Sequence, residues 1–475
     1  MRALSLLFQF LLGISLVGCG NSTKGEKYTK PNILFVFIDD MGYGDLGIYG
    51  NDEVVSPNID HLANEGLRIK QFYANSPICS PSRVAVLTGQ YPSRWGITSY
   101  IDNRKRNTER GMKHYLDLEA PSVARQLQGV GYYTAHIGKW HMGGGRDISD
   151  VPLITEYGFD ESVTQFEGLG ERYLATYETF DYPGGTRDLE RQSAALGRGE
   201  VHWEKRENFT KVFVDRTIQA IKNSQAKEKP FYINLWPDDI HTPLEPPKEL
   251  RGDLSTTARF LGVMQEMDRQ MGRLFDYIRE DPELASNTLI IFTSDNGPDG
   301  EVNQAAHLRG TKVWTYEGGF REPFIAWWPG KIPQGAINEK TVVAAIDLPL
   351  FFMDVAGADL ETGVDYDGVD ISGAILGNKE LSRNKPLFWI RPPDRPGYNG
   401  IDNPDLVIRK GAFKLLMNVD GSNIQLYNIV KDEGEQNNLA NKNPEKTKEL
   451  KSELLDWFNN YPHQIDKTLY LDNNL

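Results

Sequence analysis

Four short apolar segments constrain the fold of this chain most, because each one leads into side chains that can bind metals or move protons. The segments are residues 32–38, 135–138, 231–236 and 288–294, and they are followed by Asp39 and Asp40, by Lys139 and His141, by Asp238, Asp239 and His241, and by Asp295 and Asn296, respectively. Continuous apolar runs of this length are typical of buried parallel strands. Because open α/β sheets bind ligands at the carboxyl ends of their strands, we expect these groups to meet in one cleft.

The order of the segments along the chain predicts an α/β fold with two parts. From residue 31 to about 377, strand-like runs alternate with amphipathic segments such as 122–128 and 258–279, as in a doubly wound mixed sheet flanked by helices. After residue 385 come Pro-rich turns, short strand-like runs at 387–391, 406–408, 413–417 and 424–427, and a helical segment at 444–458. A chain of 475 residues also exceeds what one compact core usually serves. We therefore predict a large α/β domain over residues 31–385 and a smaller α+β subdomain over residues 386–475.

The first residues have the order of an export signal. A positively charged start is followed by an apolar stretch from about residue 3 to 17, and the segment ends in Leu16-Val17-Gly18-Cys19. This ending resembles a bacterial lipobox, which implies cleavage after residue 18 and acylation of Cys19. Residues 19–30 would then be a polar tether, and the protein would be exported and lipid-anchored at the bacterial outer membrane or in the periplasm. The alternative is an ordinary secretory peptide with an incidental cysteine.

The charge of the chain limits its partners. A net charge of −14 argues against a general nucleic-acid-binding protein, which needs a basic face. The basic run Arg104-Lys105-Arg106, with Arg110 and Lys113, could still steer a polyanion, although such runs are more often solvated faces.

The acidic strand ends indicate a metal site. Asp39, Asp40 and Asp295 cannot all be ionised at close range unless a cation neutralises them, and Asn296 adds an amide oxygen. An all-oxygen set favours a hard ion, Ca²⁺ or Mg²⁺. Either acidic pair alone would be equally consistent with an ordinary loop start.

Cys79 opens the pentapeptide Cys79-Ser80-Pro81-Ser82-Arg83, which is followed by a short apolar helix that stops at Gly89. Pro81 suits the first helical position, so Cys79 should lie at a helix N-terminus, where free N–H groups favour anions. A lone thiol is commonly a buried structural residue. Its place beside an anion-binding helix end, with Arg83 one turn away, favours a chemical role instead.

These residues resemble the formylglycine-dependent (type I) sulfatases of the alkaline phosphatase superfamily. The pentapeptide fits the C-x-P-S-R maturation motif of that family, and further motifs follow over nearly the whole mature chain. They are residues 31–33 with 39–42, 138–141, 294–297, 309–312, 317–321, 367–369, and 426–428 with 438–439.

The resemblance implies a role for each matched position. A maturation enzyme would convert Cys79 to formylglycine, whose hydrate is the nucleophile. Asp39, Asp40, Asp295, Asn296 and residue 79 would bind Ca²⁺, with Mg²⁺ as the other candidate. The remaining positions would bind sulfate or move protons: Lys139 and Lys312 would clamp the sulfate oxygens, His241 would protonate the leaving alcohol, Arg83 would orient the nucleophile, and His141 would take a proton as sulfate leaves.

Several of these positions have ordinary alternatives. A lone histidine is usually structural and a lysine usually solvated, but His141, His241, Lys139 and Lys312 all follow strand ends or lie in a Gly-rich loop. His307, five residues before Lys312, could touch the substrate or be a plain loop residue. The chain also departs from the family where Gln90 replaces an arginine and where Asp238 and Asp239 precede His241.

The implied substrate is a sulfated polysaccharide of algal or glycosaminoglycan type, or its oligosaccharides. Residues 166–208 lack strong periodicity, so we expect an insertion beside the site that stacks on and clamps sugar rings. Its aromatic and arginine side chains are Phe166, Arg172, Tyr173, Tyr177, Tyr182, Arg187, Arg191 and Trp203. Two alternatives remain, a formylglycine-dependent phosphonate or phosphodiester hydrolase and a non-catalytic glycan-binding lipoprotein.

Overall fold

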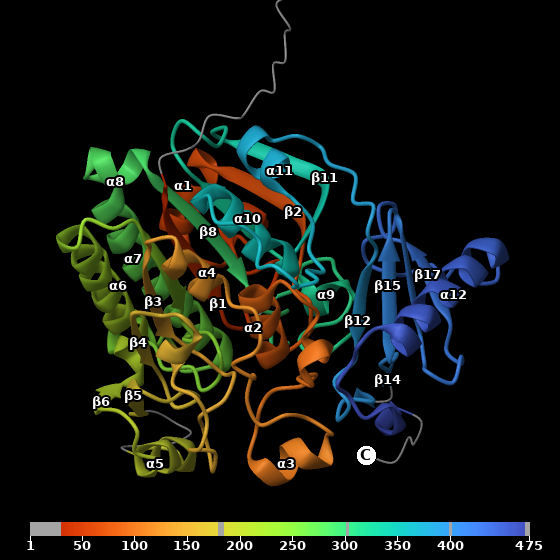
Figure 1. Cartoon of the computed structure of the whole chain (residues 1–475), viewed down its shortest axis with the longest axis horizontal. Coiled ribbons are helices and arrows are strands. Elements are labelled where there is room, and N and C mark those ends of the chain that lie inside the picture. Colours follow the sequence, from red (N-terminus) through yellow and green to blue (C-terminus); the bar gives the residue numbers. More distant parts are fainter. Residues whose placement is uncertain (1–29, 179–184, 301–303, 399–400, 471–475) are drawn as a thin grey trace, which may run out of the picture.

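A computed structural model of the chain describes residues 30–178, 185–300, 304–398 and 401–470 (Figure 1). The predicted export signal and Cys19 lie outside these residues. Within the described ranges, none of the helices combines the length and apolarity needed to cross a bilayer.

The larger part is built on a mixed, mainly parallel sheet. Its strands lie in the order β11 (Ala336–Ala344), β2 (Leu67–Tyr73), β10 (Phe324–Trp327), β8 (Thr288–Ser294), β1 (Asn32–Ile38), β7 (Phe231–Trp236), β3 (Tyr133–Gly138), β4 (Glu161–Thr164), β5 (Glu171–Thr176) and β6 (Val201–Lys205), with β9 (Arg321–Glu322) pairing with β2. β10 runs antiparallel to both of its neighbours. The central strands β8, β1, β7 and β3 are all parallel, so their carboxyl ends share one edge.

Helices cover both faces of this sheet, as predicted for a doubly wound fold. Along β1, Ile33, Phe35 and Phe37 pack with α2, α4 and α10, while Leu34 and Val36 pack with α1, α6 and α7. The α-helices are α1 (Pro57–Glu65), α2 (Cys79–Thr88), α3 (Arg104–Glu109), α4 (Val123–Gly129), α5 (Asp188–Ala195), α6 (Phe209–Ala226), α7 (Thr256–Arg279), α8 (Pro282–Ser286), α9 (Glu317–Phe320), α10 (Leu348–Ala356), α11 (Ser372–Gly377) and α12 (Pro444–Asn460). Short 3-10 turns lie at Gly47–Tyr49, Pro92–Trp95, Ile154–Tyr157, Arg206–Asn208, Lys248–Leu250, Ala345–Asp347 and Lys467–Tyr470.

The C-terminal part forms a small antiparallel sheet with one helix (Figure 1, blue). The strands lie in the order β12 (Leu387–Ile390), β15 (Leu406–Lys410), β16 (Phe413–Met417) and β17 (Gln425–Asn428), and β13 (Gly397–Tyr398) pairs with β14 (Ile401–Asp402). Leu450, Leu454 and Phe458 of α12 are buried in the same apolar cluster as residues of β15 and β16. This sheet also packs on the larger part through Trp389, whose ring stacks on Phe320.

The segment 166–208, predicted as an insertion beside the site, is more regular than its weak periodicity suggested. It contains β5, α5 and β6, and both strands extend the main sheet in parallel from β4. The irregular pattern arises because β6 is an edge strand whose residues are half-exposed or exposed, so apolar side chains do not alternate along it.

Candidate active site

The four predicted strand ends meet at one edge of the sheet. The neighbouring strands β8, β1, β7 and β3 end beside a cavity of about 960 Å³, and Lys139 and Lys312 of its lining contact Asp39 and Asp40, respectively. Its lining includes Cys79, Lys139, His141, His241 and Lys312. The sequence-predicted residues are therefore brought together from segments more than 200 residues apart.

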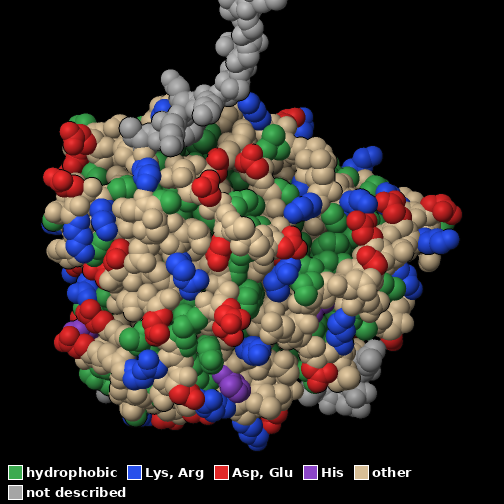
Figure 2. Space-filling model, viewed as in Figure 1, with side chains coloured by type: hydrophobic (Ala, Val, Ile, Leu, Met, Phe, Trp, Pro, Cys, Tyr) green, Lys and Arg blue, Asp and Glu red, His purple; other side chains and the backbone are tan. Residues whose placement is uncertain are grey.

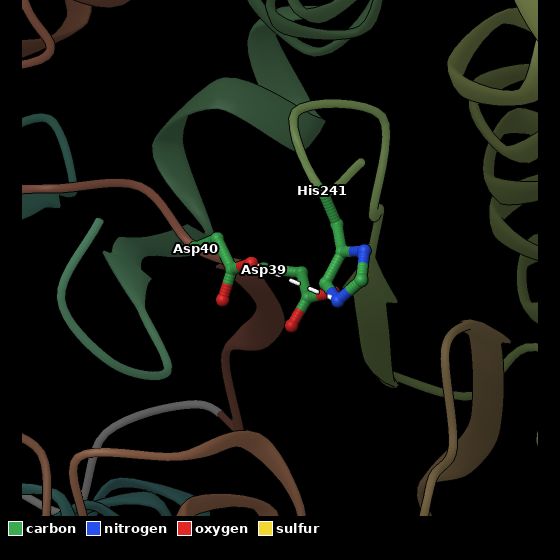
Figure 3. Close-up of side chains that lie close together, drawn as sticks. All are labelled: Asp39, Asp40 and His241. Carbon is green, nitrogen blue, oxygen red and sulfur yellow. Dashed lines mark ion pairs between the residues drawn. The ribbon is translucent and has the colours of Figure 1, made fainter. Parts of the chain in front are cut away.

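The acidic pair after β1 depends on an unusual backbone conformation. Consecutive residues of an extended strand point to opposite faces, but Asp40 adopts a left-handed conformation with φ 63°. The turn allows the carboxylates of Asp39 and Asp40 both to lie near His241 (Figure 3), and the Asp40 backbone N–H donates to Asp295 Oδ1 at 3.2 Å. Aspartate tolerates this conformation better than most residues.

Each carboxylate of the site contacts a cationic side chain. Arg83 Nη2 donates to Asp39 Oδ1 at 3.1 Å and to Asp295 Oδ2 at 2.6 Å, and its side chain is fully buried. Lys139 Nζ lies 2.7 Å from Asp39 Oδ2, and Lys312 Nζ lies 2.7 Å from Asp40 Oδ2. Burial alone would raise the pKa of Asp39, but Lys139, His241 and Arg83 outweigh it and hold that pKa well below its ordinary value.

The acidic residues also fit a divalent cation. Burial, and then the Asp39 carboxylate, raise the pKa of Asp295 well above its ordinary value, as expected where carboxylates crowd without enough positive charge. Asn296 Nδ2 donates to Asp40 Oδ1 at 2.8 Å, whereas Asn296 Oδ1 is buried and has no hydrogen-bond donor among the described residues. A ligand atom each from Asp39, residue 79 and Asp295 lie within 4.8 Å of one another. A hard cation would satisfy this free amide oxygen and relieve the repulsion.

Cys79 is the first residue of α2 and is only 2% exposed. Pro81 is therefore the third helical residue rather than the first. The third position also suits proline, because its N–H would have no partner within the helix. The thiol forms no disulfide within the described residues. Burial, followed by the Asp39 carboxylate, raises its pKa well above the ordinary value, so the unmodified side chain is a poor nucleophile.

Each of the two histidines has one ring nitrogen hydrogen-bonded to a backbone carbonyl and the other facing a carboxylate. His241 Nδ1 lies 2.7 Å from the Thr242 carbonyl oxygen, to which it must donate, so Nε2 is left for chemistry, 3.7 Å from Asp40 Oδ2. Burial, and then Lys312 and Lys139, lower the pKa of His241 to about 4. His141 Nε2 lies 3.1 Å from the Ile101 carbonyl oxygen, which assigns the proton to Nε2 and the lone pair to Nδ1. Burial and Lys139 also lower the pKa of His141.

Glu167 is a site residue that sequence reasoning missed. Its Oε2 lies 3.1 Å from His141 Nδ1 and 3.6 Å from Lys139 Nζ, and its Oε1 accepts from Arg146 at 3.4 Å. Glu167 is an isolated acid in the Gly-rich stretch after β4, so no local pattern signals this contact. The carboxylate can stabilise positive charge on His141.

Asp238 and Asp239 are largely committed to structural contacts. Arg206 donates to Asp238 Oδ1 at 2.8 Å, and the Thr210 side chain and backbone both bind Asp239. Asp238 still borders the cavity. Gln90, where the family often has arginine, is buried and donates to the Asp365 carbonyl oxygen at 2.8 Å.

His307 lies outside this group. Its Nε2 is 2.6 Å from Glu433 Oε2. His307 borders a second cavity, which has no lining residue in common with the first. The predicted substrate contact of His307 therefore gains no support from its position.

Only some of the aromatic and basic residues that were predicted to contact the substrate lie at the cavity. Phe166 and Arg187 line the cavity, with the Arg187 guanidinium 4.8 Å from the Phe166 ring centroid. Tyr182 lies outside the described residues, and Arg172 is buried against backbone carbonyls. In the predicted basic run, Arg106 and Arg110 pair with Asp102 and Asp394, which leaves less free positive charge there than the sequence suggested.

The comparisons with known proteins agree with one another. A family model described as Sulfatase matches residues 31–358. The chain is 32% identical over 400 residues to the N-acetylgalactosamine-6-sulfatase of Canis lupus familiaris, covering 81% of this chain and 72% of that protein. It is 28% identical over 530 residues to the N-acetylgalactosamine-6-O-sulfatase of Bacteroides thetaiotaomicron, covering 96% of this chain and 99% of the relative. The solved structure of Ps i-CgsB in complex with k-i-k-neocarrahexaose has TM-score 0.76 and 26% identity, over 92% of this chain and 96% of that chain.

Proposed function

Because this chain belongs to the formylglycine-dependent sulfatase family and is a sulfuric ester hydrolase, we propose that it removes sulfate from a sulfated polysaccharide or its oligosaccharides. The observation that best supports this reaction is the convergence of Lys139, Lys312 and His241 on one cavity beside Cys79. The named activities of two relatives, both on N-acetylgalactosamine 6-sulfate, and the neocarrahexaose bound to Ps i-CgsB support a sulfated glycan.

The nucleophile would be formylglycine made from Cys79 by a maturation enzyme. The pentapeptide Cys79-Ser80-Pro81-Ser82-Arg83 supports this modification, because it fits the maturation motif of the family. Once formed, the hydrated aldehyde supplies the attacking oxygen. Mass spectrometry of the peptide that spans residue 79 tests the proposal, which requires loss of sulfur from that peptide.

Asp39, Asp40, Asp295 and Asn296 would hold Ca²⁺ or Mg²⁺, as the free Asn296 oxygen supports. When bound, the cation supplies positive charge that lowers the pKa of the nucleophile and neutralises sulfate oxygens.

The basic side chains around the cavity would bind the sulfate group and position the acidic residues. Lys139 and Lys312 contribute fixed positive charges for the sulfate oxygens, which stabilise charge that develops in the transition state. Arg83 keeps Asp39 and Asp295 in place through its two hydrogen bonds.

Proton transfer would use the ring nitrogens that do not bond the backbone, His241 Nε2 and His141 Nδ1. His241 Nε2, when protonated, would donate to the leaving alcohol; a bound sulfate would raise the pKa of His241, because it offsets Lys312 and Lys139. His141 Nδ1 would accept a proton in the step that releases sulfate, with Glu167 stabilising the resulting positive charge.

The deciding experiment incubates the matured enzyme with a panel of defined sulfated oligosaccharides and measures released sulfate, with Cys79→Ala as control. We expect release from at least one glycan, none from the variant, and an unchanged melting temperature. Activity retained by Cys79→Ala would refute the scheme. A higher kcat/KM on a phosphodiester than on a sulfate ester would favour a phosphodiester hydrolase instead.

We further propose that the mature protein is exported and lipid-anchored through Cys19. The Leu16-Val17-Gly18-Cys19 sequence supports this location. Replacing Cys19 with alanine should move the protein from the membrane fraction to a soluble or uncleaved form, and an unchanged membrane fraction would contradict the anchor.

A further inference from the structure

A second cavity, of about 700 Å³, lies between the main sheet and the four-stranded C-terminal sheet. Lys70 and Gln71 of β2 border it on one side, and Arg409 of β15 borders it on the other. It shares no lining residue with the catalytic cavity. Both sheets are therefore needed to form it.

Arg409 is the unusual residue of this cavity, because its charge is buried and the Glu317 carboxylate attracts it only from beyond ion-pair distance. The residue is only 3% exposed, and no carboxylate oxygen of the described residues forms an ion pair with it. One nitrogen donates to Gln71 Oε1, while Nε and Nη1 have no hydrogen-bond partner in the described part of the chain. The guanidinium lies 4.5 Å from the Tyr73 ring centroid, a contact that does not replace a counter-ion. Burying an unpaired charge is costly.

The nearby carboxylates are bound to other cations. Lys414 stands opposite Arg409 on the neighbouring strand, on the same face of the sheet, and lies 3.1 Å from Glu317 Oε1 and 2.9 Å from Glu435 Oε1. Arg321 lies 2.9 Å from Glu433 Oε1. Glu339, another acid of the lining, is exposed and forms no ion pair among the described residues. Arg409 thus has no carboxylate within ion-pair distance in the described part of the chain.

Lys70 is a second cation of this cavity that lacks an ion pair among the described residues. It is half-buried, its Nζ lies 4.7 Å from the Tyr49 ring centroid, and it forms no ion pair within the described ranges. Burial, and then the Arg68 guanidinium, lower the pKa of Lys70, and the carboxylates of Glu339 and Glu433 only partly oppose this shift. Lys340, at the same cavity, differs because it pairs with Glu380 at 2.9 Å.

We propose that this cavity is a second, non-catalytic oxyanion site, in which Arg409 and Lys70 bind a sulfate group. The group would belong either to a sugar of the substrate chain or to the released sulfate. A tetrahedral oxyanion can accept a hydrogen bond from one of the two free guanidinium nitrogens, and a lysine adds a point charge. The choice of sulfate rests on the proposed function; the need for an anion rests on Arg409 alone.

Calorimetric titration of the full-length Cys79→Ala chain tests the site, because this chain should bind the ligand without turning it over. The probes are a chondroitin sulfate hexasaccharide, its desulfated form and inorganic sulfate. We expect a second class of binding sites in which Arg409→Gln and, separately, Lys70→Gln weaken the affinity at least tenfold. Lys340→Gln, the matched control with an acidic partner, should leave both classes unchanged.

The outcomes are separable. If the sulfated hexasaccharide binds to the second class of sites and the desulfated one does not, the cavity binds a sulfate group of the glycan. If only inorganic sulfate binds there, the cavity binds the released product. A single class of sites, or equal weakening by Lys340→Gln, overturns the proposal. On the mature enzyme, Arg409→Gln should leave kcat/KM for a small aryl sulfate within twofold, and a larger fall would mean that Arg409 acts on the catalytic site instead. Absence of sulfate release from every glycan would refute the proposed substrate but leave the calorimetric result standing.

Discussion

The contact between Glu167 and His141 makes the most informative prediction. In Glu167→Gln the carboxylate 3.1 Å from Nδ1 becomes an amide of the same shape. The amide can no longer stabilise a protonated His141, and its NH₂ group can donate to the Nδ1 lone pair that should accept the proton. Both effects weaken His141 as a base without creating a cavity.

The size of the effect follows from the burial of the pair. Both side chains are less than 10% exposed, at 5% and 7%, so solvent screens their interaction little. A hydrogen bond to a charged group contributes about 1.5–3 kcal/mol. Because about 1.4 kcal/mol corresponds to a tenfold change in rate, kcat should fall roughly 10- to 150-fold.

The assay compares kcat and KM on an activated aryl sulfate and on a sugar sulfate. The loss should appear in kcat, and it should be at least as large on the aryl sulfate, whose alcohol leaves easily and makes sulfate release limiting. Glu171→Gln is the matched control, since Glu171 lies at the same 3.1 Å from His202 but both side chains are 31% exposed. A fall in kcat of less than threefold, or a change confined to KM, would refute the role of Glu167.

Three further predictions concern the acid, the metal and the pH dependence of stability. His241→Ala should reduce kcat/KM more on sugar sulfates than on aryl sulfates, because poor leaving groups depend most on a general acid; equal losses would exclude that role. Chelation should slow sulfate release at least 100-fold, which corresponds to a rise of about 2.7 kcal/mol in the activation barrier, and adding Ca²⁺ or Mg²⁺ should restore the rate. Activity that persists in chelator would contradict the metal assignment. Burial, and then Lys467, lower the pKa of His463 to about 3, below its ordinary value of 6.5. The unfolded chain therefore binds an extra proton between these values, and the free energy of unfolding falls as pH drops from 6.5 towards 3. His463→Gln should flatten that slope by up to about 1.4 kcal/mol per pH unit in urea titrations, and an unchanged slope would refute the assignment.

Much of the site was predictable because its residues follow continuous apolar strands. β1, β7 and β8 begin and end where the apolar runs do, and parallel pairing then places their carboxyl ends together. Elsewhere the observed strand bounds differ from the predicted ones by one or two residues. At the start of β3, for example, the strand also includes an aromatic and a polar residue, which tertiary packing adds to the apolar run.

Other contacts depend on tertiary approach and leave no local signal. Glu167 reaches His141 only because the chain after β4 returns to β3, where the His141 backbone N–H donates to the Glu167 carbonyl oxygen. His307 is close to Lys312 in sequence, yet its ring contacts Glu433, in the C-terminal part. Spacing along a loop does not determine on which side a side chain lies.

The left-handed backbone at Asp40 limits what can replace that residue. Most side chains with a Cβ pay about 1–2 kcal/mol in this conformation, whereas Asp and Asn tolerate it. Alanine at position 40 would thus combine a lost charge with backbone strain, while asparagine would remove the charge alone. In a library randomised at this position, folding by itself would enrich glycine, aspartate and asparagine. Metal binding would then remove glycine, so that backbone geometry and ligand chemistry together select aspartate and asparagine.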